Sequence, residues 1–214
     1  MYWNTVTPLL RQVLEATMSS DTFNDFRLVG GTALSLRLGH RESVDIDLFT
    51  DAQYETIDFV PINDFFKSKY NYAETNAGTG IGMGTSYYVG TSENDAVKID
   101  IYYTDSFIRP INEEKKIRMA SLEDIITMKL DVIGRGGRKK DFWDLHALHD
   151  HYTVPDMIQL YIERHPYNHT REEIRSKLID FRDAEDDFDP VCLLGKHWEL
   201  IKLDFVSWVK EQLR

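Results

Sequence analysis

The chain has 214 residues, with 36 acidic and 25 basic side chains and a formal net charge of −11 at pH 7. A chain this acidic does not adhere generally to a polyanion, so a nucleic-acid partner would need a local basic patch. Its single cysteine excludes an intrachain disulfide framework, and no apolar run reaches transmembrane length. The N-terminus carries no signal-peptide pattern, so we expect a cytoplasmic protein without membrane contact.

Apolar residues at helical spacing predict a first helix over about residues 5–18, followed by a polar break. Phe26 to Val29 then form a short apolar strand, which leads directly into Gly30 and Gly31. A helix of about two turns begins near Thr32 and ends in a polar turn. The glycines allow a backbone to approach phosphate closely, and the helix start offers free N–H groups at its positive end.

The next strand carries two carboxylates, Asp45 and Asp47, between apolar residues. Side chains two apart share a face, so the carboxylates lie side by side while Val44, Ile46 and Leu48 point into a core. Such a pair repels itself unless a cation or a shared proton intervenes. Hard oxygen ligands suit Mg²⁺, or Mn²⁺, completed by water and substrate phosphate. Alternatively, the two aspartates lie on a solvent-exposed strand edge without binding a metal, but aspartate is a poor strand former.

Two polar residues of the turn before this strand have two readings. Arg41 and Ser43 either neutralise and hydrogen-bond a triphosphate or lie in a surface turn, and the sequence favours neither.

The ordered combination of diglycine, helix and acid-x-acid strand resembles the nucleotidyltransferase superfamily of DNA polymerase beta. More narrowly, GGTAL followed by RESVDIDLF resembles the AbiEii-type nucleotidyltransferases, many of which are toxins of bacterial toxin–antitoxin pairs. The resemblance covers roughly residues 27–145. It implies Mg²⁺-dependent transfer of a nucleoside monophosphate from an NTP to a hydroxyl of RNA, such as a tRNA end, or of a protein, with an antitoxin encoded nearby.

A third carboxylate, Asp100, lies in the apolar segment VKIDIY on a predicted strand. By the resemblance, it completes the metal site and helps to deprotonate the attacking hydroxyl, as in-line phosphoryl transfer requires. Asp95 and Asp105 are nearby competitors, but their neighbours do not match this pattern.

Lys129 lies on a predicted helix among apolar neighbours, a position from which lysine commonly snorkels. The segment KLDVIGRGGRKKDFWDL resembles the lysine helix of the family and its following acidic element. This resemblance implies that Lys129 contacts nucleotide phosphates, with Asp141 and Asp144 in the closing element. The spacing over residues 135–140 departs from the family pattern, and Lys140 stands where arginine is common. The segment RGGRKK therefore lines the triphosphate or an acceptor strand, or is a solvated loop.

The remaining elements favour an α/β (α+β) fold, with a small mixed sheet flanked by helices and a helical C-terminal part. We expect a catalytic domain over 1–119 and a helical domain over 120–214. The capping-box-like pair Ser121 and Asp124 begins the second part. The other predicted elements are a helix within 57–70, strands at 87–89 and 97–103, and helices at 121–133, from 139, and at 157–164, 171–181 and 198–213.

Three further features receive no catalytic role. The glycines of GTGIGMG, residues 78–84, are not followed directly by a helix, so we expect a mobile hairpin near the active site. The spacing of His146, His149 and His151 is not a recognised zinc pattern, and Cys192 has no nucleophile motif.

Two other functional classes stay open from the sequence. One is a non-catalytic, nucleotide-binding regulatory partner, and the presence of all three acids argues against it. The other is an enzyme that modifies small molecules, like the aminoglycoside nucleotidyltransferases, and the net acidity keeps this reading open.

Overall fold

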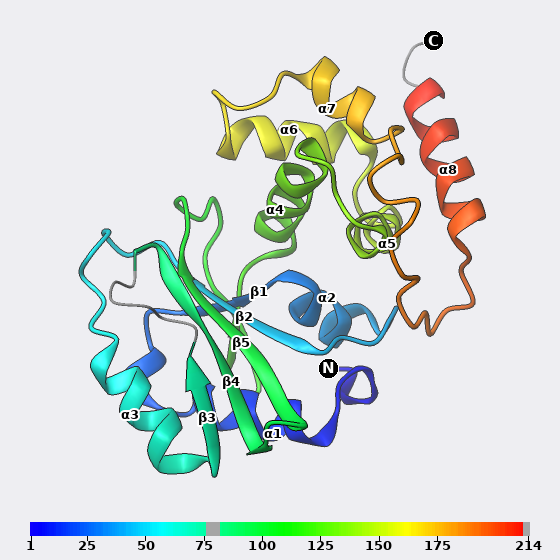
Figure 1. The fold of residues 1–214 in the computed structure, drawn as a ribbon. Helices are drawn as coiled ribbons and strands as arrows, with labels where there is room; N and C mark the ends of the chain where they lie inside the picture. Colours follow the sequence, from blue (N-terminus) through cyan, green and yellow to red (C-terminus); the bar gives the residue numbers. More distant parts are fainter. Residues whose placement is uncertain (76–81, 212–214) are drawn as a thin grey trace.

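The computed structural model describes residues 1–75 and 82–211. Within them, seven strands form one mixed sheet in the order β3-β4-β5-β2-β1-β7-β6 (Figure 1). This confirms the predicted α/β class with a mixed sheet flanked by helices. The strands are β1 (Arg27–Val29), β2 (Asp45–Thr50), β3 (Tyr72–Thr75), β4 (Gly84–Ser92), β5 (Asp95–Tyr103), β6 (Asn112–Glu114) and β7 (Ile117–Met119).

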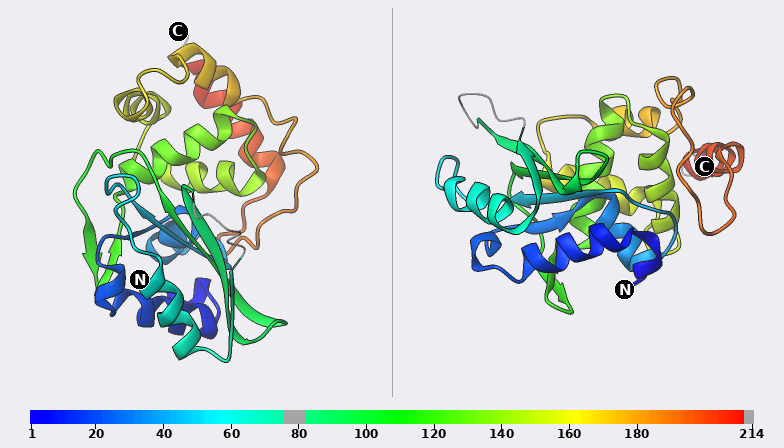
Figure 2. Two further views of the ribbon diagram at one scale, coloured as in Figure 1. Left: turned by 60° about the vertical axis from the view of Figure 1, so that its left-hand side comes forward. Right: turned by 60° about the horizontal axis from the view of Figure 1, so that its bottom comes forward.

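Helices lie on both sides of this sheet and beyond it (Figures 1 and 2). None of the helices in the described residues combines the length and the apolar character needed to cross a lipid bilayer. They are α1 (Pro8–Met18), α2 (Gly30–Leu38), α3 (Val60–Lys69), α4 (Leu122–Gly134), α5 (Lys139–Leu148), α6 (Val154–Arg164), α7 (Arg171–Lys177) and α8 (Trp198–Glu211), with short 3₁₀ turns at Trp3–Thr5 and Asp21–Phe23.

The strict alternation of β2 and β5 divides the sheet into two unlike faces. Ile46, Leu48, Ile99 and Ile101 are fully buried on one face, whereas their neighbours on the other face are only half-buried. Helices α1 and α3 cover the apolar face, where the ring of Phe66 lies 4.9 Å from that of Tyr87. The polar face is therefore left for the site.

One predicted core residue is wrong. Val44 exposes 65% of its surface, although the alternation of the strand placed it inward with Ile46. The reason is that β2 begins only at Asp45, so Val44 lies in the preceding loop and does not follow the strand's alternation.

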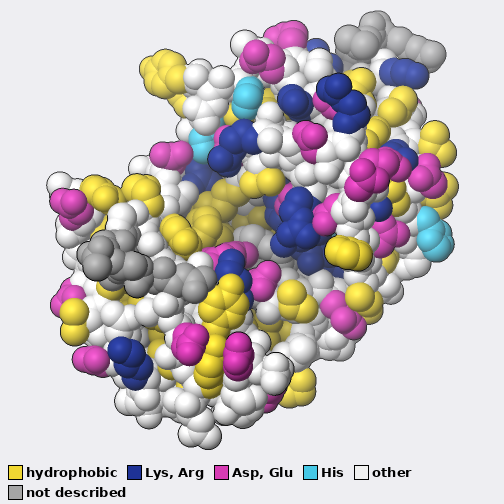
Figure 3. Space-filling model, in the orientation of Figure 1, with side chains coloured by type: hydrophobic (Ala, Val, Ile, Leu, Met, Phe, Trp, Pro, Cys, Tyr) yellow, Lys and Arg dark blue, Asp and Glu magenta, His cyan; other side chains and the backbone are white. Residues whose placement is uncertain are grey.

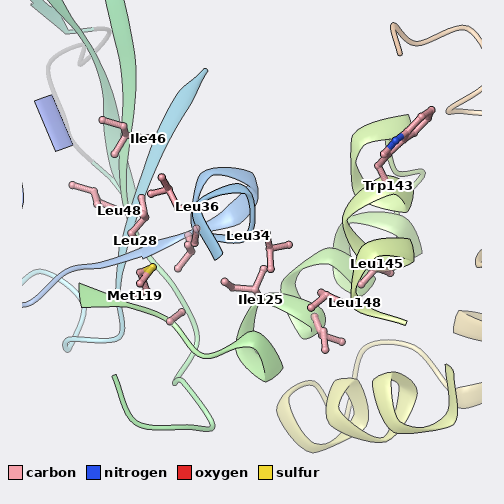
Figure 4. Packing of buried hydrophobic residues seen from close by; sticks show 14 of the residues in the cluster. Leu28, Leu34, Leu36, Ile46, Leu48, Met119, Ile125, Trp143, Leu145 and Leu148 are labelled. Atoms are coloured by element: carbon pink, nitrogen blue, oxygen red, sulfur yellow. The ribbon is translucent and has the colours of Figure 1, made fainter. Parts of the chain in front are cut away.

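Helix α2 lies between the sheet and the helical part of the chain, and it is buried on both sides. Figure 4 shows Leu36 beside Leu28 of the sheet, whereas Leu34 lies towards Ile125 and Leu148 of the helices. A helix buried all round is fixed by its packing. Its N-terminus at Gly30 is therefore held rigidly at the end of β1.

The C-terminal part begins as its capping pair predicts, because the Ser121 hydroxyl accepts a hydrogen bond from the Asp124 N–H at 3.0 Å. Helix α7 ends at Lys177, earlier than the predicted residue 181, with Leu178 as its C-cap. The sheet ends at Met119 and α4 begins at Leu122, and the division into domains at 119/120 stays a prediction.

Figure 3 shows the molecule hollowed between the sheet and the helical part, with apolar, basic and acidic side chains around the hollow.

Candidate active site

The half-buried face of the sheet brings together carboxylates from two neighbouring strands. Strands β2 and β5 run parallel, in a register that places Asp47 beside Asp100 and Asp45 beside Lys98. All four side chains point to the same face, because each strand alternates in step with its neighbour. The predicted association of the three aspartates on one face is thus a consequence of this register.

Asp47 lies against the start of α2. Gly30 has φ +67°, and a Cβ at this position would overlap a carboxylate oxygen of Asp47. Burial, together with the charges of Asp100 and Asp45, raises the pKa of Asp47 to about 6, although Lys129 and Lys140 act in the opposite direction. The site thus holds a carboxylate whose negative charge is not fully compensated.

Both oxygens of Asp100 are held by neighbouring side chains. The Ser86 hydroxyl of β4 donates to Oδ1 at 2.5 Å, and the Lys98 ammonium donates to Oδ2 at 2.6 Å. Two donors fix the orientation of this carboxylate.

The second glycine makes room for a cation. A Cβ on Gly31 would overlap the guanidinium of Arg41, which is itself buried. Arg41 donates from Nε and Nη2 to the two oxygens of Asp144, at 2.7 and 2.9 Å. The structure thus places Arg41 in the wall of the site, paired with an acid of α5.

Asp144 accepts hydrogen bonds from three cationic or ionisable side chains. Besides Arg41, it is bonded to His40 Nε2 at 2.7 Å and to the Lys129 ammonium at 2.7 Å. Burial alone would raise the pKa of Asp144, but Arg41 and Lys129 hold it well below its usual range. Lys129 also bonds Asp141 at 2.7 Å, so these five side chains form one buried ion cluster between the α2–β2 loop and helices α4 and α5.

The sequence did not identify His40 as part of this cluster. Its only sequence signal is its position next to Arg41 in a loop, and such a position does not predict burial. Thr32 and Ser43 are buried as well, with their hydroxyl oxygens 2.8 Å apart, and Thr32 also donates to the carbonyl oxygen of Asp45. These two hydroxyls tie α2 to the start of β2.

The basic segment 135–140 is largely neutralised by acids. Its first basic residue, Arg135, pairs with Asp131 of α4. Arg138 pairs with Asp187 at 3.0 Å, and Lys139 pairs with Asp189 at 2.9 Å. Lys140 makes no such hydrogen bond or ion pair among the described residues, yet its charge lowers the pKa of Asp47. It is the basic side chain of this segment that remains free for a ligand.

Three features were predicted to have no catalytic role: the glycine-rich segment, the histidines and Cys192. Residues 78–81 of the glycine-rich segment fall outside the described residues, so the expected hairpin is not tested. His146 is hydrogen-bonded to Asp204 at 2.8 Å, and the His149 ring stacks on Trp208. Cys192 accepts a hydrogen bond from the Lys196 N–H at 3.3 Å.

Whether a divalent cation fits this site depends on which side-chain oxygens are available to bind it. Within residues 1–75 and 82–211, no three His, Cys, Asp or Glu side chains are grouped closely enough to hold a metal ion by themselves. The two oxygens of Asp100 are bonded to Ser86 and Lys98, so the predicted site with three carboxylate ligands stays a prediction. Mg²⁺ commonly takes only one or two protein carboxylates, and the uncompensated charge of Asp47 suits it.

Comparison with known structures shows which fold the chain has. JHP933 from Helicobacter pylori is similar over 94% of this chain and 87% of its own, with a TM-score of 0.59 and 19% identity. The nucleotidyltransferase toxin MenT4 from Mycobacterium tuberculosis is similar over 94% of this chain and 83% of its own, with a TM-score of 0.52 and 16% identity. The chain thus has a nucleotidyltransferase fold.

The family follows from the sequence match. The profile of the AbiEii nucleotidyl transferase toxins, described as belonging to type IV toxin–antitoxin systems, matches residues 12–207, and the chain belongs to this family. The Aquifex aeolicus protein aq_aa25 is 30% identical in an alignment that covers 95% of each chain. The protein is therefore a nucleotidyltransferase, as its diglycine and acid-x-acid motifs predicted.

We expect Gly30→Ala to destabilise the fold and to abolish transfer activity, because alanine would adopt an unfavourable φ and displace Asp47. Gly195→Ala is the matched control, since Gly195 has φ +66° but no atom within 4 Å of its added Cβ. Chemical denaturation should show a loss for Gly30→Ala at least about 1 kcal/mol larger than for Gly195→Ala. Equal losses would show that Asp47 does not require the glycine.

Proposed function

We propose that this nucleotidyltransferase moves a nucleoside monophosphate from an NTP to an acceptor hydroxyl, with Asp45, Asp47 and Asp100 as its catalytic carboxylates. The observation that carries the proposal is the register of β2 and β5. It sets Asp47 beside Asp100 on the half-buried face, directly against the N-terminus of α2.

The residues would act as follows. Asp45 and Asp47 would hold Mg²⁺ or Mn²⁺, with Asp100 joining them, and the metal would supply neutralisation of the phosphate charge. Asp100, oriented by Ser86, accepts the proton of the acceptor hydroxyl. The hydroxyl oxygen bonds to the α-phosphorus, the bond from that phosphorus to the bridging oxygen breaks, and pyrophosphate leaves.

The triphosphate would lie at the start of α2, between Gly30 and the basic side chains of the opposite wall. The N–H groups of a helix N-terminus bind phosphate oxygens. Lys140 supplies a free ammonium there, and Lys129 keeps one N–H beyond the two bonded to Asp141 and Asp144. Arg41 and Asp144 hold this wall in position, and Thr32 and Ser43 hold the helix start.

For the acceptor, we propose a hydroxyl of RNA, such as a tRNA end, or of a protein. The description of the family as type IV toxin–antitoxin supports a cognate antitoxin as a partner in the cell. A small-molecule acceptor is the second candidate, because Arg135, Arg138 and Lys139 are already paired with acids. A wall with few free cations suits a short acceptor better than a long nucleic acid.

The test is incubation with α-labelled NTPs, divalent metal, and separately RNA, protein and small-molecule fractions of a cell extract. Label in one fraction identifies the acceptor class, and the same reaction with Asp47→Asn should show none. Equal labelling by Asp47→Asn would refute the assignment of the carboxylates.

We expect Lys140→Met to weaken NTP binding by about tenfold, because it removes a cation that has no protein partner among the described residues. Arg135→Gln serves as the control, since Arg135 is exposed and already paired with Asp131. Calorimetric titration with a non-hydrolysable NTP analogue measures both. An unchanged affinity in Lys140→Met would place the triphosphate elsewhere.

A further inference from the structure

The face that carries the carboxylates also carries one lysine, Lys98. Its ammonium lies 2.6 Å from Oδ2 of Asp100, and in the register of the sheet it stands opposite Asp45. About a third of its side chain is exposed. A cation of the protein thus lies at the carboxylates that are proposed to bind the metal.

Lys98 is held as a charged group at neutral pH. A lysine is charged at neutral pH unless it is deeply buried without a partner, and this ammonium is partly exposed and donates a hydrogen bond to Asp100. No other hydrogen bond or ion pair of its ammonium is found among the described residues. The long, partly exposed stem therefore leaves the ammonium free to move once Asp100 has another partner.

A lysine at this position acts directly on metal binding. A divalent cation bound to Asp100 would compete with the ammonium for Oδ2 and would be repelled by it at short range. An incoming triphosphate changes this balance, because its negative charges attract both the metal and the ammonium. Mg²⁺ at such sites is commonly bound by substrate phosphates together with one or two carboxylates.

We propose that Lys98 prevents tight binding of a divalent cation to the free protein, so that the metal is loaded only together with the NTP. This inference rests on the proposed function, since it takes Asp47 and Asp100 as metal ligands. When the metal–NTP complex arrives, Lys98 leaves Oδ2 of Asp100 and turns to a phosphate oxygen. The protein then holds its metal only when a substrate is present.

The experiment measures Mn²⁺ binding to the full chain by electron paramagnetic resonance of the free ion, with and without a non-hydrolysable NTP analogue. Lys98→Met removes the charge and keeps the length of the stem, whereas Lys98→Arg keeps the charge. Lys67→Met is the background control, because Lys67 is an exposed residue of α3, the helix that covers the opposite face of the sheet. Thermal unfolding of each variant checks that it is folded.

We expect Lys98→Met to bind Mn²⁺ without nucleotide at least about tenfold more tightly than the unaltered chain, which corresponds to about 1.4 kcal/mol. Lys98→Arg and Lys67→Met should stay within about threefold, and the NTP analogue should reduce the difference. Equal affinities of Lys98→Met and the unaltered chain, including no detectable binding by either, would overturn the inference.

A further variant separates this inference from the proposed function. If Asp47→Asn loses Mn²⁺ binding in the presence of the NTP analogue while Lys98→Met gains nothing without it, the role of Lys98 is wrong and the metal site stands. If Asp47→Asn binds Mn²⁺ with the analogue as well as the unaltered chain does, the assignment of the metal site itself is wrong, and the inference with it.

Discussion

Asp47→Asn is expected to abolish nucleotidyl transfer, by at least about a thousandfold, while making the folded chain more stable at neutral pH. The loss of activity follows because an amide supplies neither the charge nor the second anionic oxygen that a divalent cation requires at this position. The gain in stability follows because the neutral amide escapes the cost of holding a carboxylate against Gly30 and beside Asp100.

The raised pKa of Asp47 determines how the stability of the folded chain should change with pH. The pKa of Asp47 is about 6 in the folded chain against a reference of 3.8, so between these values the folded state binds more protons than the unfolded state. The contribution of Asp47 to the free energy of unfolding is therefore fully present below about pH 4, and it is lost as the pH rises to about 6. The total loss is at most about 3 kcal/mol, since each pKa unit corresponds to about 1.4 kcal/mol.

Urea denaturation of both chains between about pH 4 and pH 8 measures the effect. The advantage of Asp47→Asn should be smallest at the acid end and should level off above about pH 6. Asp25→Asn, in an exposed loop position before β1, is the control and should show no such trend. An advantage that does not change with pH would contradict the explanation by burial and like charge.

The sequence predicted those parts of the site that depend on local order. The diglycine, the short helix and the alternation of Asp45 and Asp47 lie within 18 residues of one another, and each is readable from local rules. Asp100 lies far along the chain, and its expected place beside them came from the family resemblance. Only the parallel pairing of β2 with β5 in the structure shows which residue of each strand faces which.

The buried ion cluster could not be predicted in the same way. Arg41 and Asp144 are about 100 residues apart, and their contact requires α5 to pack beside the α2–β2 loop. One local signal existed, because Lys129 stands between Ile125 and Ile133 in a helix whose apolar side is buried. The ammonium of such a lysine either extends to solvent along the apolar surface or pairs with a buried acid. Only tertiary packing decides between these two arrangements.

Asp144→Asn is expected to destabilise the fold by about 3–5 kcal/mol, because it removes the charge shared by Arg41, Lys129 and His40 in a fully buried position. The matched control is Glu163→Gln. Glu163 also receives two hydrogen bonds from one arginine, Arg109, at 2.7 and 3.1 Å, but this pair is exposed, and its loss should cost no more than about 1 kcal/mol.

A double-mutant cycle separates the cost of an unpaired charge from a loss of packing. Asp144→Asn is expected to destabilise the fold because Lys129 loses part of its compensating charge. If so, the double variant Asp144→Asn/Lys129→Met should lose at least about 1 kcal/mol less stability than the sum of the two single losses. Chemical denaturation of the four chains gives the coupling energy. Strictly additive losses would mean that Asp144 stabilises the fold through Arg41 and His40 alone. Lys129 would then be held by Asp141 alone.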